Sequence, residues 1–319
     1  GRSVEKVPIG HVTNGVHVST WMAPAMRALL DRHLGLSWIT RTGAAETWAR
    51  FDEIADSELW AVRRELRAEL VEFVRARATS DRLARGEPPD YVAAAARAFD
   101  PEHLTIGFAR RLAGYKRLGL IMYDLQRSLK LLTGDRPVQI LLAGKAHPQD
   151  DEAKRIVQRL FQAKGAPFVG ERIAYLHDYD MSIAQHLVAG CDVWVNVPRP
   201  PLEASGTSGM KAALNGGLNL SVLDGWWAEA YDGSNGWAID GDGDPDPEAT
   251  DRRHAARLID LLEHEVVPTF NERDSAGLPR AWIGHVRASI RTAASRFSAD
   301  RMVGDYIEGV YLAPKRRAQ

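Results

Sequence analysis

The architecture of the chain can be read outward from residues 192–223, which have the sequence DVWVNVPRPPLEASGTSGMKAALNGGLNLSVL. Two apolar segments within it, Asp192–Val197 and Leu218–Leu223, have the length and composition of buried β-strands. Between them lie a loop rich in proline, serine and glycine and a short apolar helix. Two strands that are joined through a helix run parallel, so this stretch predicts an α/β protein.

Further strand candidates continue the pattern, with helices between them, at Leu104–Ala109, Val138–Ala143, Arg172–Leu176 and, more weakly, Trp237–Ile239. Continuous apolar strands flanked by helices predict a doubly wound, Rossmann-like parallel sheet that binds its ligands at the carboxyl ends of the strands. Residues able to carry chemistry follow four of these strands: Arg110, Arg111 and Lys116; Gly144 and Lys145; His177, Asp178 and Tyr179; and the window Glu203–Lys211.

The chain is predicted to form a single domain, 1–319, in three parts: a mostly helical lead-in (1–100), the Rossmann-like core (101–240), and an acidic loop with helices (241–319). In the lead-in we expect a short strand over 7–21 that is broken at Asn14-Gly15, followed by a helix over Pro24–His33. A second helix should cover Asp56–Ala78, with Asp56 and Ser57 as its cap, and an alanine-rich helix should end near Phe99. The last part should contain helices near Arg252–Glu265, Leu278–Arg296 and Asp300–Tyr311.

The charge and cysteine content of the chain limit the partners and the compartment that we expect. The formal net charge is -1 and the pI is about 6.9, so we expect no general attraction to nucleic acid or to a membrane surface. The single cysteine, Cys191, together with the lack of a long apolar run, predicts a cytoplasmic protein. The first residue is Gly1 rather than Met, and we expect the chain to be part of a longer protein.

No metal site is expected. The acidic segment Asp240-Gly-Asp242-Gly-Asp244 imitates a calcium loop, but Pro245 stands where such a loop needs glycine, so a solvated loop is the better interpretation. His147 and His177 lack the partners of a zinc motif.

Lys211 is the unusual residue of the central window, because Met210, Ala212, Ala213 and Leu214 surround it. If this helix packs into a core, the amine must pair with an anion or lose its charge. A neutral amine is a nucleophile toward carbonyl groups, and the N–H groups at a helix start suit a phosphate, so the two together predict a pyridoxal-phosphate site. The alternative is a surface lysine on an ordinary turn.

The segment after the first strand of the core is strongly basic. Arg110, Arg111, Lys116 and Arg117 place four cations within eight residues. A dianionic phosphate would relieve their repulsion, whereas the alternative is a solvated basic turn. The glycine fingerprints of dinucleotide and ATP sites are absent here.

Five segments, in this order, resemble the α-glucan (glycogen, starch and maltodextrin) phosphorylases. The resemblance rests on these motifs: Thr13-Asn14-Gly15-Val16 with Trp21; Arg110-Arg111 with Tyr115-Lys116-Arg117; Gly144-Lys145-Ala146 with Pro148; Glu203-Ala204-Ser205-Gly206-Thr207 with Met210-Lys211 and Asn215-Gly216; and Phe297-Ser298 with Asp300-Arg301. They span nearly the whole chain, and the short stretch between Trp21 and Arg110 is similar to the compact bacterial type.

This resemblance implies a GT-B glycosyltransferase fold, of which the chain would be the second, C-terminal domain. It implies that pyridoxal 5'-phosphate is the cofactor, that an α-1,4-glucan and inorganic phosphate yield glucose 1-phosphate with retention, and that an N-terminal catalytic half completes the enzyme. A homodimer is a further expected partner. In this resemblance, Lys211 carries the cofactor covalently, and Arg111 and Lys116 bind the substrate phosphate. The residues that contact the cofactor are Thr207, Ser208, Gly209, Tyr179, Trp21 and Arg110. Those that bind glucose hydroxyls are Glu203, Ser205, Gly206 and Asn14.

The chain departs from the family pattern at two places. Ser208-Gly209 replaces a frequent Gly-Asn, and Asp180 stands where an arginine commonly follows the cofactor tyrosine. Two other functions stay open on the sequence alone. A GT-B nucleotide-sugar glucosyltransferase would often carry an acidic residue eight positions after Glu203, where Lys211 stands, and a non-catalytic carbohydrate-binding module would need no cofactor.

Overall fold

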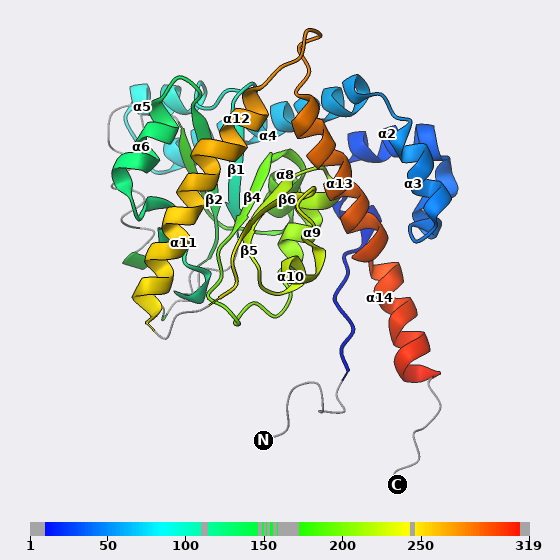
Figure 1. Ribbon diagram of the computed structural model, residues 1–319. Coiled ribbons are helices and arrows are strands. Elements are labelled where there is room, and N and C mark those ends of the chain that lie inside the picture. Colours follow the sequence, from blue (N-terminus) through cyan, green and yellow to red (C-terminus); the bar gives the residue numbers. More distant parts are fainter. Residues whose placement is uncertain are drawn as a thin grey trace.

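The computed structural model describes residues 10–109, 114–145, 149, 151, 154–155, 158, 172–242 and 246–312. Its centre is a six-stranded parallel sheet in the order β3-β2-β1-β4-β5-β6 (Figure 1). The strands are β1 (Leu104–Ala109), β2 (Val138–Ala143), β3 (Ile173–Leu176), β4 (Val193–Asn196), β5 (Leu218–Val222) and β6 (Gly236–Ile239). This is the Rossmann order, with the change of direction between β1 and β4. The predicted α/β class and all six predicted strands are confirmed.

The described helical segments surround the sheet: α1 (Val18–Trp21), α2 (Pro24–Leu34), η2 (Leu36–Arg41), α3 (Ala45–Asp52), α4 (Asp56–Ala84), α5 (Pro89–Ala95), η3 (Gly114–Lys116), η4 (Leu118–Met122), α6 (Leu125–Thr133), α8 (Met181–Gly190), α9 (Thr207–Leu214), α10 (Trp226–Ala230), α11 (Pro247–Leu261), η5 (Leu262–Val266), α12 (Val267–Asn271), α13 (Arg280–Arg296), α14 (Ala299–Tyr306) and η6 (Ile307–Tyr311). Helices α6 and α11 cover one face, and α8 and α9 cover the other (Figure 1).

The strands are buried on both faces because their side chains alternate between two apolar clusters. Leu141 and Trp194 pack with Leu187 of α8, whereas Ile140 and Val195 belong to the larger cluster on the other side. Every residue of β1, β2, β4 and β5 is buried. This burial explains why the sequence shows continuous apolar runs rather than alternation.

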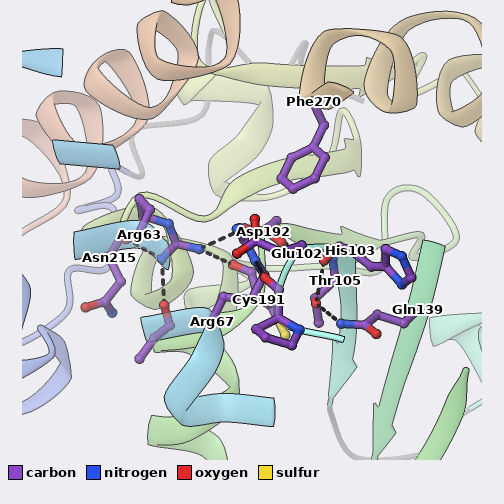
Figure 2. Close-up of polar contacts among 12 residues, drawn as sticks. Arg63, Arg67, Glu102, His103, Thr105, Gln139, Cys191, Asp192, Asn215 and Phe270 are labelled. Carbon is purple, nitrogen blue, oxygen red and sulfur yellow. Dashed lines mark hydrogen bonds and ion pairs between the residues drawn. The ribbon is translucent and has the colours of Figure 1, made fainter. Parts of the chain in front are cut away.

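Helix α4 joins the lead-in to the sheet through a buried charge cluster (Figure 2). Oδ1 of Asp192, directly before β4, accepts hydrogen bonds from Arg67 at 2.7 Å and Arg63 at 3.4 Å, and its Oδ2 accepts from the Thr105 amide at 3.0 Å. Gln139 donates to the Thr105 hydroxyl at 2.7 Å. These residues lie at the amino ends of the strands, so the cluster fixes the edge of the sheet opposite to the ligand-binding edge.

Three expectations for the lead-in were wrong. Residues 7–9 of the expected strand lie outside the described residues. In the rest, Val16 forms an isolated bridge with Ser298, and Val18–Trp21 is helical. Ala55, rather than Asp56 or Ser57, occupies the N-cap position of α4, and no side chain caps this helix; the Asp56 carboxylate binds Arg280 and Arg287 instead.

The alanine-rich helix α5 ends at Ala95, before the expected Phe99, whose φ of 65° is incompatible with a right-handed helix. At the other end of the chain, α14 has no buried residue and extends from the body of the protein (Figure 1). In the part of the chain that the structure describes, every helix is too short or too polar to cross a membrane.

Candidate active site

Helix α9 starts at the carboxyl end of β4, after a loop that turns sharply at Gly206. The φ angle of Gly206 is +85°, in the region that favours glycine, and a side chain there would also meet the Trp226 ring at 3.3 Å. The first amide groups of a helix lack partners within the helix. The start of α9 therefore presents the amide groups of Thr207 and Ser208, where the sequence analysis expects a phosphate.

A cavity of about 350 Å³ opens beside this helix start. Many of the predicted site residues line it: Lys116, Tyr179, Glu203, Ser205, Gly206, Thr207 and Ser208, together with Ala109, Tyr115, Leu202 and Ala204. Ala109 ends β1, Tyr179 follows β3, and the Glu203–Ser208 segment follows β4. The cavity thus lies where a Rossmann-like sheet binds its ligands.

The polar wall of the cavity contains an ion pair that the sequence did not predict. Lys116 Nζ donates to Glu203 Oε2 in a very short contact, and both side chains are largely buried. Nearby, the Ser205 hydroxyl is buried and has no hydrogen-bond partner among the described residues. Because an unpaired buried hydroxyl is costly, this oxygen is well placed for a polar ligand.

Lys211 lies one helical turn after Thr207 and is half-buried. Its Nζ lies 3.6 Å from the centroid of the Trp21 ring. Burial lowers the pKa of the amine below its ordinary value of 10.5. Neither Lys211 nor Trp21 lines the cavity of Lys116 and Glu203, but Lys211 and Thr207 are four residues apart on α9 and so share one face of that helix.

The structure gives physical reasons for both departures from the family pattern. A Cβ atom at Gly209 would lie 2.3 Å from Asn219 Oδ1, and Asn219 Nδ2 donates to the Gly209 carbonyl at 3.1 Å, so the Asn219 side chain occupies the space of a side chain at 209. Asp180 caps α8 by accepting a hydrogen bond from the Ile183 amide at 2.9 Å. Both residues serve local packing.

Among the described residues, four predicted site residues do not line the cavity: Asn14, Trp21, Gly209 and Lys211. Arg110 and Arg111 lie outside the described residues. Asn14 is exposed, does not line the cavity, and uses its carbonyl to accept from Arg301 at 3.2 Å.

The sequence analysis gave no role to the side chain of Asn215, which is fully buried and bonds both Trp21 and Lys211. The signal available was the Asn-Gly pair at the end of the helix, which indicates a helix stop.

One group of described residues has ligand atoms close enough to hold a cation: Asp260, Glu263 and His264. Arg127 already pairs with both carboxylates, at 2.6 Å and 2.5 Å, and these pairs raise the pKa of its guanidinium. The group is therefore an ion-pair cluster.

The chain is similar to known phosphorylases over nearly its whole length. Residues 5–233 match the family model described as Carbohydrate phosphorylase. A glycogen phosphorylase of Mycobacterium tuberculosis is 48% identical over 313 residues, which make up 98% of this chain and 36% of the relative. A glycogen phosphorylase of Aquifex aeolicus is 43% identical, over 95% of this chain and 44% of the relative. A maltodextrin phosphorylase of Thermococcus litoralis is 40% identical, over 98% of this chain and 36% of the relative. The chain thus spans less than half the length of these relatives.

Proposed function

Because the chain belongs to the carbohydrate phosphorylase family, we propose that it is the pyridoxal-phosphate-binding part of an α-1,4-glucan phosphorylase. The observation that carries the proposal is the environment of Lys211: a half-buried amine against an indole ring, with a lowered pKa, one turn from the start of α9. A lysine of this kind has a larger neutral fraction than a surface lysine and can attack a carbonyl group.

The residues present fit the cofactor. Lys211 would attach it, the amides of Thr207 and Ser208 and the Thr207 hydroxyl would hold its phosphate, and Tyr179 and Trp21 would line it. Gly209, assigned beside the phosphate, already donates its amide to the Gly206 carbonyl at 3.1 Å. Arg110 is assigned beside the cofactor from the resemblance alone. When bound, pyridoxal phosphate supplies a phosphate group that exchanges a proton with inorganic phosphate.

For the substrates, we assign phosphate to Lys116 and Arg111, and glucose hydroxyls to Glu203, Ser205, Gly206 and Asn14. The Lys116–Glu203 pair supports this assignment because it places a cation and a hydrogen-bond acceptor side by side in the cavity. A phosphate oxygen would bond to the anomeric carbon of the terminal glucose, the α-1,4 C1–O bond would break, and the shortened glucan would leave with a proton from inorganic phosphate on its 4-oxygen. The product is glucose 1-phosphate with retention, while Glu203 and Ser205 orient the sugar.

The facing wall of the cleft would come from an N-terminal half, since the chain spans 36% to 44% of its relatives. We infer that residues 1–319 form one domain of that larger enzyme. We expect the chain alone to bind the cofactor but not to phosphorolyse glucans, because half a cleft neither orients the sugar nor excludes water. A homodimer and a cytoplasmic location stay predictions.

The deciding experiment is covalent trapping. The chain is incubated with pyridoxal phosphate, reduced with borohydride, and digested for peptide mapping. We expect the label on Lys211 and its loss in Lys211→Ala, while the matched variant of an exposed lysine, Lys130→Ala, keeps it. A label spread over surface lysines, or one that persists in Lys211→Ala, would contradict the proposal and favour a non-catalytic module.

The role of the partner half is tested by glucose 1-phosphate formation from maltoheptaose and phosphate. We expect turnover only when the N-terminal half is supplied in trans, since orientation of bound reactants can lower a barrier by roughly 7–11 kcal/mol. Robust turnover by this chain alone would show that it is not a catalytic half.

The phosphate assignment is tested by thermal unfolding with inorganic phosphate. At about a hundred times its dissociation constant, phosphate should add roughly 2.7 kcal/mol to the free energy of unfolding. Arg111→Ala should remove most of this gain, and Lys130→Ala should keep it. An unchanged gain in Arg111→Ala would rule out that residue as a ligand.

A further inference from the structure

We propose that Asn215 is a positioning residue for the reactive lysine: its side-chain amide ties the Trp21 segment to helix α9, so that the indole covers the Lys211 amine. This inference rests on the proposed function, because it concerns the residue to which the cofactor would be attached.

The amide of Asn215 bonds both partners at once. Its Nδ2 donates to the Trp21 carbonyl at 2.8 Å and to the Lys211 carbonyl at 3.0 Å, and its Oδ1 accepts from the Ala23 amide at 2.7 Å. Both donors and one acceptor position of the amide are therefore used. Trp21 ends α1 and Ala23 precedes α2, so the amide holds the turn between these two helices on both sides.

Asn215 is itself held rigidly. It is 0% exposed, and its carbonyl accepts from Arg63 Nη1 at 2.7 Å. Arg63, also 0% exposed, donates to the Ala189 and Cys191 carbonyls at 2.6 Å and 2.9 Å and pairs with Asp192 (Figure 2). The position of Asn215 is thus fixed from α4 and from both ends of the segment that joins α8 to β4.

The position of the Trp21 ring determines how far water reaches the Lys211 amine. The face of the Trp21 ring stands 3.6 Å from Nζ and keeps water from that side. Among the described residues, burial is the cause of the lowered pKa. The titratable groups on the helices nearby include Arg63 and Glu69 of α4, His186 of α8, and His285 and the arginines of α13; Glu69 and His186 line one pocket with Trp21. If the Trp21 segment loosens, water reaches Nζ, the ammonium form is stabilised, and the pKa rises toward 10.5.

A purely structural asparagine would behave differently. Asn235 is also 0% exposed, and its Nδ2 donates to the Ala230 carbonyl at 2.8 Å and to Thr292 at 3.3 Å. These bonds hold the segment between α10 and β6 against α13, and no hydrogen bond of the Asn235 side chain in the described part of the chain reaches Trp21 or Lys211. Asn235→Ser therefore matches Asn215→Ser in burial and in lost hydrogen bonds, but it leaves the lysine untouched.

The test measures the pKa of Lys211 without cofactor, from the pH dependence of its reductive methylation with formaldehyde and a hydride donor, quantified on the Lys211 peptide. We expect the pKa to rise in Asn215→Ser, with methylation at neutral pH slowed about threefold or more for a rise of roughly half a unit. Asn235→Ser should leave the pKa unchanged. An unchanged pKa in folded Asn215→Ser, or an equal rise in Asn235→Ser, would overturn the proposal.

A second variant covers the case in which Asn215→Ser does not fold. Ala23 has φ -62° and ψ 146°, which proline can adopt. Ala23→Pro removes the N–H group that donates to Asn215 Oδ1, and the proline ring enters the space of that hydrogen bond, so the Asn215 amide must move away from the Trp21 segment. Ala23→Pro should also raise the pKa of Lys211, by less than Asn215→Ser does. An unchanged pKa in Ala23→Pro would overturn the proposal. Since methylation needs no pyridoxal phosphate, this outcome is separate from the trapping experiment, whose failure on the unsubstituted chain would overturn the proposed function instead.

Discussion

The two ends of the sheet bury polar groups in opposite ways. At the amino ends, Arg63, Arg67 and Asp192 satisfy one another and the neighbouring backbone, although each arginine keeps one nitrogen without a partner in the described part of the chain. At the carboxyl ends, the Ser205 hydroxyl and the Trp226 Nε1 group have no partner among the described residues, and Lys211 faces a ring instead of an anion.

Charge at the amino ends is therefore paired within the fold. At the carboxyl ends Lys116 and Glu203 also pair, but under the proposed function the unpaired polar groups there would meet a ligand. A buried polar atom without a partner lowers the free energy of unfolding, and such atoms are expected where a bound ligand would supply the missing hydrogen bond.

The largest effect is expected from breaking the amino-end cluster with Asp192→Asn. The change leaves Arg63 and Arg67, both buried, without their shared anion. Removing one partner of a buried ion pair typically costs about 3–5 kcal/mol. We expect a loss of this size in the free energy of unfolding, measured with urea.

The matched control is an exposed pair of the same kind. Arg301 and Asp305 are 2.7 Å apart on α14, with Asp305 48% exposed, so Asp305→Asn should change stability by less than about 0.5 kcal/mol. Equal losses in the two variants would show that the amino-end cluster is not special.

An intermediate effect is expected from Gly209→Ala at the carboxyl end. The added Cβ would meet Asn219 Oδ1 at 2.3 Å and Trp226 Nε1 at 3.0 Å, and overpacking a tight site costs typically about 1–3 kcal/mol. We expect this loss in urea unfolding, together with a weaker pyridoxal-phosphate label on Lys211, since α9 must shift.

Gly304→Ala on α14 provides the comparison. No heavy atom of the described residues lies within 4 Å of the position that a Cβ would take there, so the better helix propensity of alanine should stabilise by roughly 0.5–1 kcal/mol. If Gly209→Ala were also stabilising, the site around Asn219 would be looser than the structure indicates.

The sequence predicted the sheet well because a buried parallel strand leaves a strong local signal. Each apolar run from Leu104–Ala109 to Trp237–Ile239 corresponds to a strand, and most of the cavity residues follow from the rule that ligands bind at strand ends. The motif around Lys211 could also be recognised, since its residues are close together along the chain.

Contacts between distant residues could not be predicted in this way. Lys116 and Glu203 are 87 positions apart, and Asn215 meets Trp21 across 194 positions, so no local pattern records either pair. The predicted cap of α4 was wrong for the same reason, although the helix does start at Asp56: the Asp56 carboxylate was expected to cap α4, but arginines of α13, more than 220 residues away, compete for it.

The smallest effect, and the one that tests the carboxyl end most directly, is the pH dependence of stability due to Lys211. Burial lowers the pKa of this amine in the folded chain below the 10.5 of an ordinary lysine. Between these two pKa values the unfolded chain binds more protons than the folded chain, so the folded state gains stability as the pH rises. Below the folded pKa, the full cost of holding the ammonium group in its half-buried place is present.

The measurement compares the unsubstituted chain with Lys211→Met in urea at several pH values from 7 to about 10.5, where lysine titrates. The difference in the free energy of unfolding should move in favour of the unsubstituted chain as the pH rises and level off near 10.5, and Lys130→Met supplies the reference for changes elsewhere in the protein. A difference that stays flat, or moves in favour of Lys211→Met, would mean that the amine is as well solvated as a surface lysine. The carboxyl end would then hold no group prepared for a carbonyl, and the contrast between the two ends of the sheet would be lost.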